Sequence, residues 1–469
     1  MTSNEGSADT HSLRSIFFPS SVAIAGVGER NSGRQYLDSL LLSGFTGPIY
    51  PVNGRGGEAD GLSLYRTVKD IPGTVDYVIS CIPADAVPKL ITDCCEKGAR
   101  VVSLFTAGFS EVGTEIGLRL EAEISDLARA NGIRILGPNC MGVYCPSSGM
   151  SFVDDFPSES GPVALVSQSG GNAIYLVRSA AQRGVRFSKV ISYGNGCDVD
   201  ESDLLDYLAH DPETQVATVY IEGVRDGAKF ARSLRKLASE KPVVVLKAGN
   251  SADGARSAAS HTGSMAGAGA AWSGLIRQCG AIEVSTLEEM IDMMVTLPFL
   301  PVPGGRNVAV AGYGGGASVL AGDVCNSYGL SLPPAHEMVS REIASHIRSE
   351  AGLVLTNPVE LNLPPQAAYQ ATRCLAASES VDLVLVNCVC GQTPWPIYDD
   401  LADRLADTVI RVHAEMGRPT VVALDPHVPQ TRDQFCRLQQ RYCESGLPVY
   451  HSMHSACLAV DRLLRYHAR

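Results

Sequence analysis

The chain has 469 residues, of which 45% are hydrophobic and 19% charged, and its formal net charge is -12. A chain of this length and composition is expected to fold into two to four globular domains. Its acidic balance argues against a broad surface for nucleic acid or anionic membranes, because both need a wide positive field.

The N-terminal stretch MTSNEGSADTHSLRS is polar and has no apolar segment behind a basic start, so no signal peptide is predicted. No run reaches the ~18 apolar residues that a membrane-spanning helix needs. The fourteen cysteines include no paired CxxC units at zinc spacing, so we expect reduced, buried thiols and no metal site. Together these features predict a soluble, cytoplasmic protein.

Three stretches share one local pattern: a short apolar run, a glycine-rich turn and a helix-like segment. They are SVAIAGVGERNSG (21–33), GPVALVSQSGGNA (161–173) and GRNVAVAGYGGGAS (305–318). After each, apolar strands alternate with helical stretches, as DYVISCIP, ADAVPKLITDCCEKGA and RVVSLF do in the first block. This alternation predicts doubly wound α/β units, with parallel sheets covered by helices on both faces.

Two stretches rich in Pro, Gly and Ser interrupt the alternation, at 145–162 and 298–305. Such segments are typical of linkers between domains. We therefore expect three domains, at 1–150, 158–300 and 305–469.

A glycine-rich turn before a helix suits phosphate, because free N–H groups and the positive end of the helix dipole face the ligand. In the first turn, Asn31 replaces the third glycine of the GxGxxG pattern. The second strand ends with Asn53 and Arg55, where NAD would favour an acidic residue. An arginine there suits a phosphate on the adenosine ribose, as in NADP or coenzyme A (CoA).

The second turn, VSQSGGNA, offers Ser167, Gln168, Ser169, Gly170 and Gly171 at a helix start, a set that can bind phosphate or a phosphoryl group. A serine that caps the helix without binding a ligand is the alternative. The third turn, AGYGGGAS, has no charged or nucleophilic companion nearby, which favours a simple connection between strand and helix.

His261 stands among small side chains in SAASHTGSMAG (257–267). A neutral imidazole is a nucleophile near pH 7, and a segment of small residues can carry it between two sites. A nucleophilic histidine also needs a carboxylate that orients its ring, and Glu222 at the end of the VYIEG strand is the candidate. Taken alone, a structural histidine and a carboxylate bonded to a nearby turn remain open alternatives.

In this order, the motifs GVGERNSG, YPVN, ILGPNCMG, VSQSGGNA, SYGNGCDVDESDLLDYL, VYIEG, LKAG, ASHTGSMAG and NPVELN resemble the α subunit of the NDP-forming (ADP-forming) acyl-CoA synthetases, which are related to succinyl-CoA synthetase. The resemblance runs from about residue 15 to 365. It implies a Rossmann-like CoA-binding domain, then a flavodoxin-like domain with the phosphohistidine loop, then a second flavodoxin-like ligase-CoA domain.

The family's chemistry implies that acyl-CoA and phosphate give an acyl phosphate, whose phosphoryl group passes to His261 and then to ADP, with Glu222 as the orienting acid. The phosphoryl group would rest on the 167–171 turn. The residues implied for CoA are Gly26, Gly28, Asn31, Ser32, Gly33, Asn53, Arg55, Ile82, Pro83, Thr106, Ala107, Gly108 and Asn139. The family often has a lysine in VNPK where this chain has Asn-Gly-Arg.

All three predicted blocks are α/β units of this kind, so the ATP-grasp module that holds ATP or ADP with Mg²⁺ in such enzymes is expected on a separate β partner, in an α2β2 assembly. The substrate would be a small carboxylic acid. A non-catalytic CoA- or nucleotide-binding regulatory protein and an NADP oxidoreductase are the alternatives. The joint presence of His261, Glu222 and SQSGG favours the enzyme.

Overall fold

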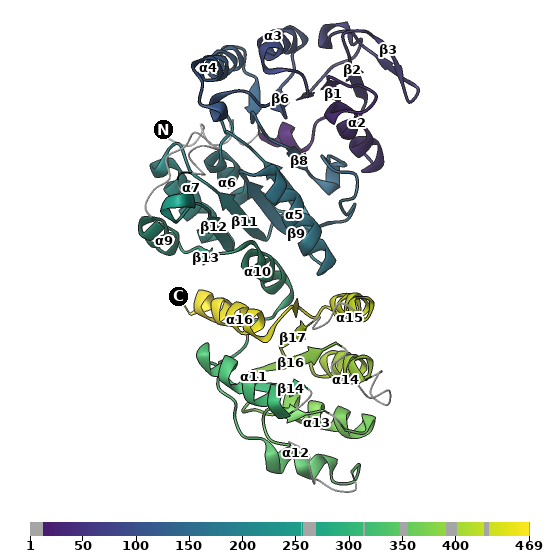
Figure 1. The fold of residues 1–469 in the computed structure, drawn as a ribbon, viewed down its shortest axis with the longest axis vertical. Coiled ribbons are helices and arrows are strands. Elements are labelled where there is room, and N and C mark those ends of the chain that lie inside the picture. Colours follow the sequence, from purple (N-terminus) through teal and green to yellow (C-terminus); the bar gives the residue numbers. More distant parts are fainter. Residues whose placement is uncertain are drawn as a thin grey trace. The chain divides into compact units, whose positions relative to one another are not determined.

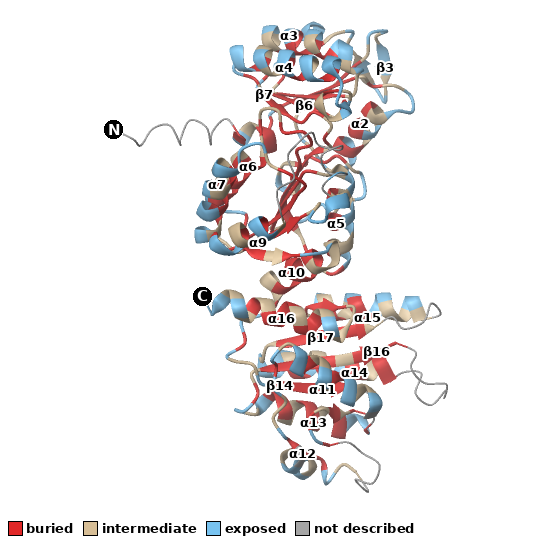
Figure 2. Ribbon diagram, turned by 60° about the vertical axis from the view of Figure 1, so that its left-hand side comes forward, coloured by how far each residue is buried: buried red, intermediate tan, exposed pale blue. Residues whose placement is uncertain are grey.

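The computed structural model describes residues 13–254, 256, 269–312, 315–347, 355–361, 363–390, 401–425 and 431–468. It contains three main sheets, each built largely of parallel strands and flanked by helices (Figure 1). The strands are buried, whereas the helices turn one face toward solvent (Figure 2). The predicted α/β class with doubly wound parallel sheets is therefore confirmed.

The first sheet has the strand order β2-β1-β5-β6-β7, with every pair parallel. All four residues of β1 and of β5 are buried, as expected for strands covered on both faces. The strands are β1 (Val22–Ala25), β2 (Ile49–Val52), β5 (Tyr77–Ser80), β6 (Val101–Leu104) and β7 (Arg134–Leu136). Around them lie α2 (Ser32–Leu42), α3 (Val87–Lys97), α4 (Glu115–Ala130), the hairpin β3 (Gly57–Ala59) and β4 (Leu62–Leu64), and 3-10 turns at Val68–Asp70, Ala84–Ala86 and Ser110–Val112.

The second sheet has the order β13-β12-β11-β9-β10-β8. Its strands are β8 (Gly142–Tyr144), β9 (Ser160–Ser167), β10 (Phe187–Ser192), β11 (Val216–Ile221), β12 (Val243–Lys247) and β13 (Ile282–Val284). Its helices are α5 (Gly170–Gln182), α6 (Glu201–His210), α7 (Gly227–Glu240), α9 (Gly269–Gln278) and α10 (Leu287–Phe299), with a 3-10 turn at Pro146–Ser148.

One edge of this second sheet differs from the expected parallel pattern. Strand β8 pairs antiparallel with β10, in the register Val190 with Tyr144 and Ser192 with Gly142. The chain therefore enters the second sheet before the predicted linker at 145–162. A stretch of three residues carries too little periodicity to reveal such an edge strand from sequence.

The third sheet is parallel in the order β15-β14-β16-β17-β18. Its strands are β14 (Val308–Gly312), β15 (Val359–Glu360), β16 (Leu383–Val389), β17 (Thr420–Asp425) and β18 (Val449–Tyr450). Its helices are α11 (Gly315–Ser327), α12 (His336–Ile343), α13 (Pro365–Ala377), α14 (Leu401–Met416), α15 (Arg432–Glu444) and α16 (Met453–His467).

The chain forms two compact units. One comprises residues 1–181 and 186–290 with the first two sheets, and the other comprises 182–185 and 291–469 with the third. Arg183 explains why its short segment belongs with the third sheet: its guanidinium is buried, pairs with Asp292 at 2.7 Å and donates to the carbonyl of Val449 at 2.6 Å. A buried guanidinium needs such partners, so the second half of α10 is tied to this unit as well.

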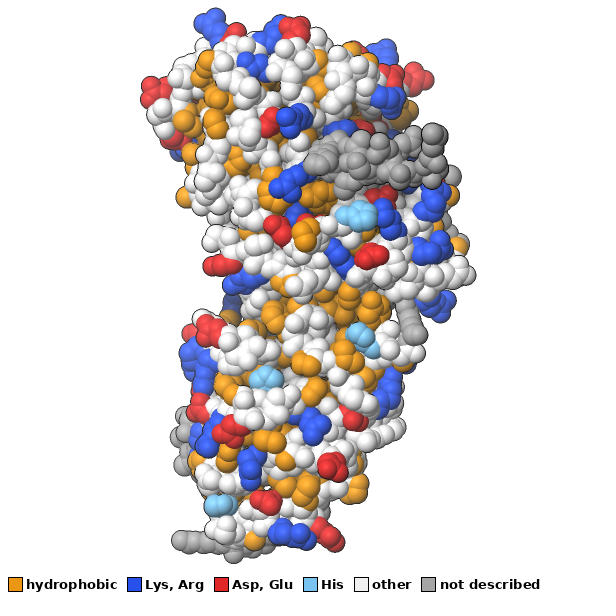
Figure 3. Space-filling model, turned by 180° about the vertical axis from the view of Figure 1, so that it is seen from behind, with side chains coloured by type: hydrophobic (Ala, Val, Ile, Leu, Met, Phe, Trp, Pro, Cys, Tyr) orange, Lys and Arg blue, Asp and Glu red, His pale blue; other side chains and the backbone are white. Residues whose placement is uncertain are grey.

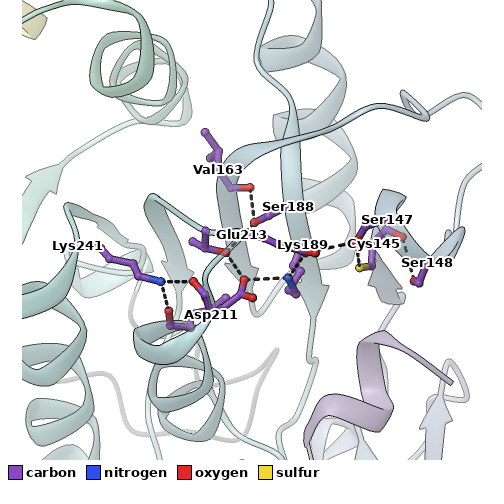
Figure 4. Close-up of polar contacts among 11 residues, drawn as sticks. Cys145, Ser147, Ser148, Val163, Ser188, Lys189, Asp211, Glu213 and Lys241 are labelled. Carbon is purple, nitrogen blue, oxygen red and sulfur yellow. Dashed lines mark hydrogen bonds and ion pairs between the residues drawn. The ribbon is translucent and has the colours of Figure 1, made fainter.

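A buried lysine lies at the centre of a polar cluster beside the second sheet (Figure 4). Lys189 on β10 is fully buried and pairs with Asp211 at 2.8 Å and Glu213 at 2.6 Å. Its ammonium group also lies 5.9 Å and 5.5 Å from the ring centres of Phe17 and Phe18. The cluster therefore fastens the first helical residues of the described chain to the second sheet.

No described helix is long and apolar enough to cross a membrane. On the face shown in Figure 3, basic and acidic side chains are interspersed, without a broad area of one sign.

Candidate functional site

The first glycine-rich turn connects β1 to α2 and packs against the turn after β5. Gly26 has a φ of +99°, and a Cβ there would come within 2.8 Å of the carbonyl oxygen of Cys81. A Cβ on Gly33 would come within 2.5 Å of the carbonyl oxygen of Gly26. Gly33 thus allows the close helix–strand packing that the third glycine of a dinucleotide turn usually provides.

Asn31 uses its side chain inside this turn. Its Oδ1 accepts hydrogen bonds from the backbone N–H groups of Gly28 at 3.0 Å and Arg34 at 3.1 Å, and its Nδ2 donates to the carbonyl of Gly26 at 2.8 Å. Asn31 is the N-cap of α2, which begins at Ser32. The residue that replaces the third glycine therefore closes the turn.

Asn53 and Arg55 follow β2 and lie beside the same turn. The Nδ2 of Asn53 donates to the carbonyl of Val27 at 2.5 Å, and its Oδ1 accepts from the backbone N–H of Arg55 at 3.0 Å. The Arg55 side chain is exposed and has no ion pair with any residue that the structure describes. A guanidinium in this state is available to a phosphate.

A cavity of about 550 Å³ lies between the ends of the first and second sheets. Nine of its lining residues are among those predicted for CoA or phosphate, and six are not. The predicted residues are Ile82, Pro83, Thr106, Ala107, Asn139, Gln168, Ser169, Gly170 and Gly171. The others are Cys81, Phe105, Cys140, Met141, Gly194 and Asn195.

Hydrogen bonds hold two of the predicted CoA turns together. The hydroxyl of Thr106 donates to the carbonyl of Ile82 at 2.8 Å and lies 3.0 Å from the hydroxyl of Ser80. The N–H of Gly108, whose φ is +110°, donates to Glu111 at 2.5 Å. The turns after β5 and β6 are therefore fixed with respect to each other at the cavity wall.

Two thiols line the cavity as well. Burial raises the pKa of Cys81 to about 12 and that of Cys140 to about 11. Both groups are therefore neutral thiols near pH 7 and poor nucleophiles.

The second glycine-rich turn presents backbone donors to the cavity. The hydroxyl of Ser167 donates to the carbonyl of Ser169 at 2.7 Å, and the hydroxyl of Ser169 accepts from the N–H of Asn172 at 3.3 Å. The N–H groups of Gly170 and Gly171 donate to no residue in the described parts of the chain. They lie at the N-terminus of α5, where the helix dipole favours an anion.

Gln168 joins this turn to Glu222. Its Oε1 accepts hydrogen bonds from the backbone N–H groups of Glu222 at 2.7 Å and Gly223 at 3.1 Å. Glu222 is 7% exposed, and the hydroxyl of Tyr220 donates to its carboxylate at 3.3 Å. Burial, together with the negative charge of Glu222, raises the pKa of Tyr220 to about 12, so that hydroxyl remains a donor near pH 7.

The strand that leads toward the predicted phosphohistidine segment passes directly beside Glu222. Lys247, the last residue of β12, is in register with Ile221, and the N–H of Ala248 donates to the carbonyl of Ile221 at 2.8 Å. Burial lowers the pKa of Lys247, and the charge of Glu222 opposes this shift. His261 itself lies outside the described residues.

The predicted residues thus fall into two groups. Nine of them, from the turns after β5, β6, β7 and β9, share the cavity. The first glycine-rich turn, Asn53, Arg55, Gly108, Ser167 and Glu222 are not part of its lining. Among the residues that sequence reasoning missed, Asn195 stands between two glycines in GNG, which was the available signal.

Comparison with known proteins identifies the family. Residues 20–146 match a family model described as a CoA binding domain, and residues 160–297 match one described as a succinyl-CoA ligase like flavodoxin domain. The α subunit of ADP-forming acetate–CoA ligase I from Pyrococcus furiosus is 34% identical over 467 residues, which cover 97% of this chain and 98% of that protein. The chain belongs to the α-subunit family of the ADP-forming acyl-CoA synthetases. The predicted class of acid–thiol ligase is therefore confirmed at the level of the family.

Two further members show the breadth of this family. An ADP-forming 4-hydroxybutyrate–CoA ligase from Nitrosopumilus maritimus is 33% identical, over 66% of this chain and 45% of that protein. A solved structure of the dinucleotide-forming acetyl-coenzyme A synthetase 1 of Candidatus Korarchaeum cryptofilum, in complex with phosphate and ADP, is 30% identical, with a TM-score of 0.82 and coverage of 97% of each chain.

Proposed function

We propose that this chain is the α subunit of an enzyme that interconverts a carboxylic acid, CoA and ATP with acyl-CoA, ADP and phosphate. The observation that carries the proposal is that one cavity is lined both by the turns assigned to CoA and by the turn assigned to phosphate. A phosphate on that turn can reach the carbonyl carbon of a thioester only if both ligands share one space.

The chemistry proceeds in three transfers. A phosphate oxygen attacks the thioester carbonyl, and the CoA thiolate leaves, which gives an acyl phosphate. An imidazole nitrogen of His261 then attacks phosphorus, and the carboxylate of the acid leaves. Finally, the terminal phosphate oxygen of ADP attacks the phosphohistidine, ATP forms and the imidazole is released. The reverse sequence activates the acid with ATP.

The described residues support specific roles in these steps. The N–H groups of Gly170 and Gly171, at the N-terminus of α5, would stabilise the phosphoryl charge. Glu222 would bind the second ring nitrogen of His261 and stabilise its positive charge. The position of Ala248 beside Ile221 supports this role, because the chain then continues toward residue 261 from next to Glu222.

For CoA, the proposed contacts are the turn at 26–33, Asn53, Arg55 and the cavity residues Ile82, Pro83, Thr106, Ala107 and Asn139, together with Gly108. The nucleotide and its Mg²⁺ would be held by an ATP-grasp β partner, in an α2β2 assembly. The name of the Pyrococcus furiosus relative as an α subunit supports such a partner. The match to the 4-hydroxybutyrate–CoA ligase covers 45% of that protein, so more than half of that polypeptide has no counterpart in this chain. This also supports a separate partner, which would supply the part that this chain lacks.

Labelling with γ-³²P-ATP in the presence of a β partner tests this proposal. We expect label on the chain that is labile in acid and stable in alkali, and that is lost in His261→Ala. The matched control is His210→Ala, at the exposed end of α6, which should label like the unmodified chain. Persistent label in His261→Ala would overturn the proposal, and absence of any label with a competent partner would indicate a non-catalytic CoA-binding protein.

A further inference from the structure

Asn195 lies in the turn after β10 and is fixed against the turn that carries Asn139. Its backbone N–H donates to the carbonyl of Pro138 at 2.9 Å, and the N–H of Cys197 donates to the carbonyl of Gly137 at 3.0 Å. Gly194 has a φ of +58°, and a Cβ there would come within 2.2 Å of the Pro138 oxygen. The backbone at 194–197 is therefore packed tightly on this wall of the cavity.

The side-chain amide of Asn195 is oriented by acceptors on one side. Its Nδ2 donates to Glu111 at 2.6 Å, to Glu121 at 3.0 Å and to the hydroxyl of Ser110 at 3.3 Å. Carboxylates accept hydrogen bonds and do not donate them, so the nitrogen must face this group and Oδ1 must be the other atom of the amide.

The same group of acceptors is itself anchored. Glu111 accepts from the N–H of Gly108 at 2.5 Å and so closes the turn at 106–108, while Glu121 pairs with Arg225 at 2.6 Å. Burial acts to raise the pKa of Glu121, but the hydrogen bonds from Ser110, Arg225 and Asn195 outweigh it and hold that pKa below its usual value. Glu121 is therefore ionised near pH 7, and the Nδ2 of Asn195 stays facing it.

The Oδ1 of Asn195 accepts no hydrogen bond from any residue in the described ranges, although Asn195 is only 5% exposed and lines the cavity. The Oδ1 atom is not among the buried unpaired side-chain atoms of the described chain, so it is the part of this nearly buried side chain that reaches the cavity. A fixed, unpaired acceptor on a cavity wall is suited to a ligand that supplies a donor. Of the ligands proposed for this cavity, ionised carboxylic acids have no hydrogen-bond donor, and phosphate is assigned to the N–H groups of Gly170 and Gly171. The pantetheine arm of CoA has two amide N–H groups.

We infer that Asn195 is a CoA-positioning residue whose Oδ1 accepts a hydrogen bond from an amide N–H of the pantetheine arm. This inference rests on the proposed function, because it requires CoA in the cavity. The other residues proposed for CoA lie on turns of the first sheet and at Asn139. Asn195 would add a contact from the second sheet. Through Glu111, the same residue couples the position of that arm to the turn at 106–108.

A thermodynamic cycle between protein and ligand tests the inference. The dissociation constants of CoA, and of two CoA analogues that each carry an ester in place of one pantetheine amide, are measured for the full chain and for Asn195→Ala. With the unmodified chain, one analogue should bind about tenfold more weakly than CoA, the usual worth of one hydrogen bond. With Asn195→Ala, the same change from amide to ester should weaken binding by less than about twofold.

Ser110→Ala is the matched control, since it removes a partner of Nδ2 and leaves Oδ1 in place. It should retain the full tenfold loss with the same analogue. If Asn195→Ala is unstable in thermal unfolding, Asn195→Ser replaces it in the cycle. Equal losses for the unmodified chain and the Asn195 variant, with both analogues, would overturn the inference. Failure of the unmodified chain to bind CoA would instead overturn the proposed function.

Discussion

The side-chain carbonyl of Gln168 accepts a hydrogen bond of 2.7 Å from the backbone N–H of Glu222. This contact joins the turn before α5, where an anion is favoured, to the end of β11, which carries Glu222. Gln168 therefore fixes the distance between the two groups that, in the proposed mechanism, the phosphorylated histidine contacts. Its role is positioning, because its Oε1 is already engaged by protein N–H groups.

The first prediction removes this acceptor. Gln168→Met keeps the volume of the side chain but leaves the buried N–H groups of Glu222 and Gly223 without a partner. Each lost partner costs about 1–3 kcal/mol, so the midpoint of the unfolding transition that contains the second sheet should fall by at least ~4 °C. Differential scanning calorimetry measures the shift. Gln35→Met, at an exposed position of α2, is the control, and an equal midpoint in both variants would contradict the assigned role.

The second prediction concerns the 3′-phosphate of CoA. The Arg55 side chain is exposed and has no ion pair with the described residues. Arg55→Ala should therefore weaken the binding of CoA without changing the stability of the fold. We expect the KM for CoA to rise about tenfold, and the KM for 3′-dephospho-CoA to change less than twofold. Arg119→Ala, on the exposed side of α4, should change neither value. A similar rise for both ligands would show that Arg55 does not bind this phosphate.

Much of the fold could be predicted from the sequence because buried parallel strands produce continuous apolar runs such as VAIA and VVVLK. The glycine-rich pattern indicated the turn at 167–171, and the resemblance to the family indicated the CoA turns; together they supply nine of the residues that line the cavity. The sequence could not identify Asn195 and Glu111, because their roles depend on hydrogen bonds across 84 positions of the chain. Nor could it place Arg183, whose partners Asp292 and Val449 are still more remote in sequence, at 109 and 266 positions.

The glycine-rich turn at 26–33 shows both the strength and the limit of a motif. The pattern indicated a phosphate-binding turn and treated Asn31 as a departure from it. The structure gives Asn31 three hydrogen bonds within the turn and places the close-packing glycine at Gly33. Spacing alone cannot show that Gly33 takes the role expected at position 31. Only the close approach of Gly33 to the Gly26 carbonyl reveals which glycine must lack a Cβ.

The third prediction is a pH dependence of stability that originates at Glu201. This residue begins α6, is 3% exposed, and its Oε1 has no hydrogen bond to a described residue. Burial, with the nearby negative charge of Asp200, raises the pKa of Glu201 to about 7. The unfolded chain releases this proton at about pH 4.3. Between these values the folded state binds a proton that the unfolded state lacks, so the free energy of unfolding falls as the pH rises, by an amount on the order of 3 kcal/mol above pH 7.

Glu201→Gln should remove this dependence, because the amide stays neutral. Its melting temperature should exceed that of the unmodified chain at pH 8, and the two should converge at pH 4 to 5. Glu240→Gln, at the exposed end of α7, should follow the unmodified chain across the range. A constant difference between Glu201→Gln and the unmodified chain would mean that Glu201 does not titrate near neutral pH.

The last prediction concerns the charge of the acid. The described residues that line the cavity include Phe105, Met141 and Ile82, and none of them is a lysine, arginine or histidine. The carboxylate that reacts loses its charge when it becomes the acyl group of the acyl phosphate, whose phosphoryl group the N–H groups of Gly170 and Gly171 would stabilise. A second carboxylate would lose its hydration without a cationic partner, which costs several kcal/mol. Butanoate and succinate have the same number of carbon atoms, so a comparison between them tests the effect of the second carboxylate. In CoA-dependent ADP release with a β partner, kcat/KM should be at least about 100-fold higher for butanoate, whereas succinate within tenfold of butanoate would show that the acyl chain does not enter this cavity.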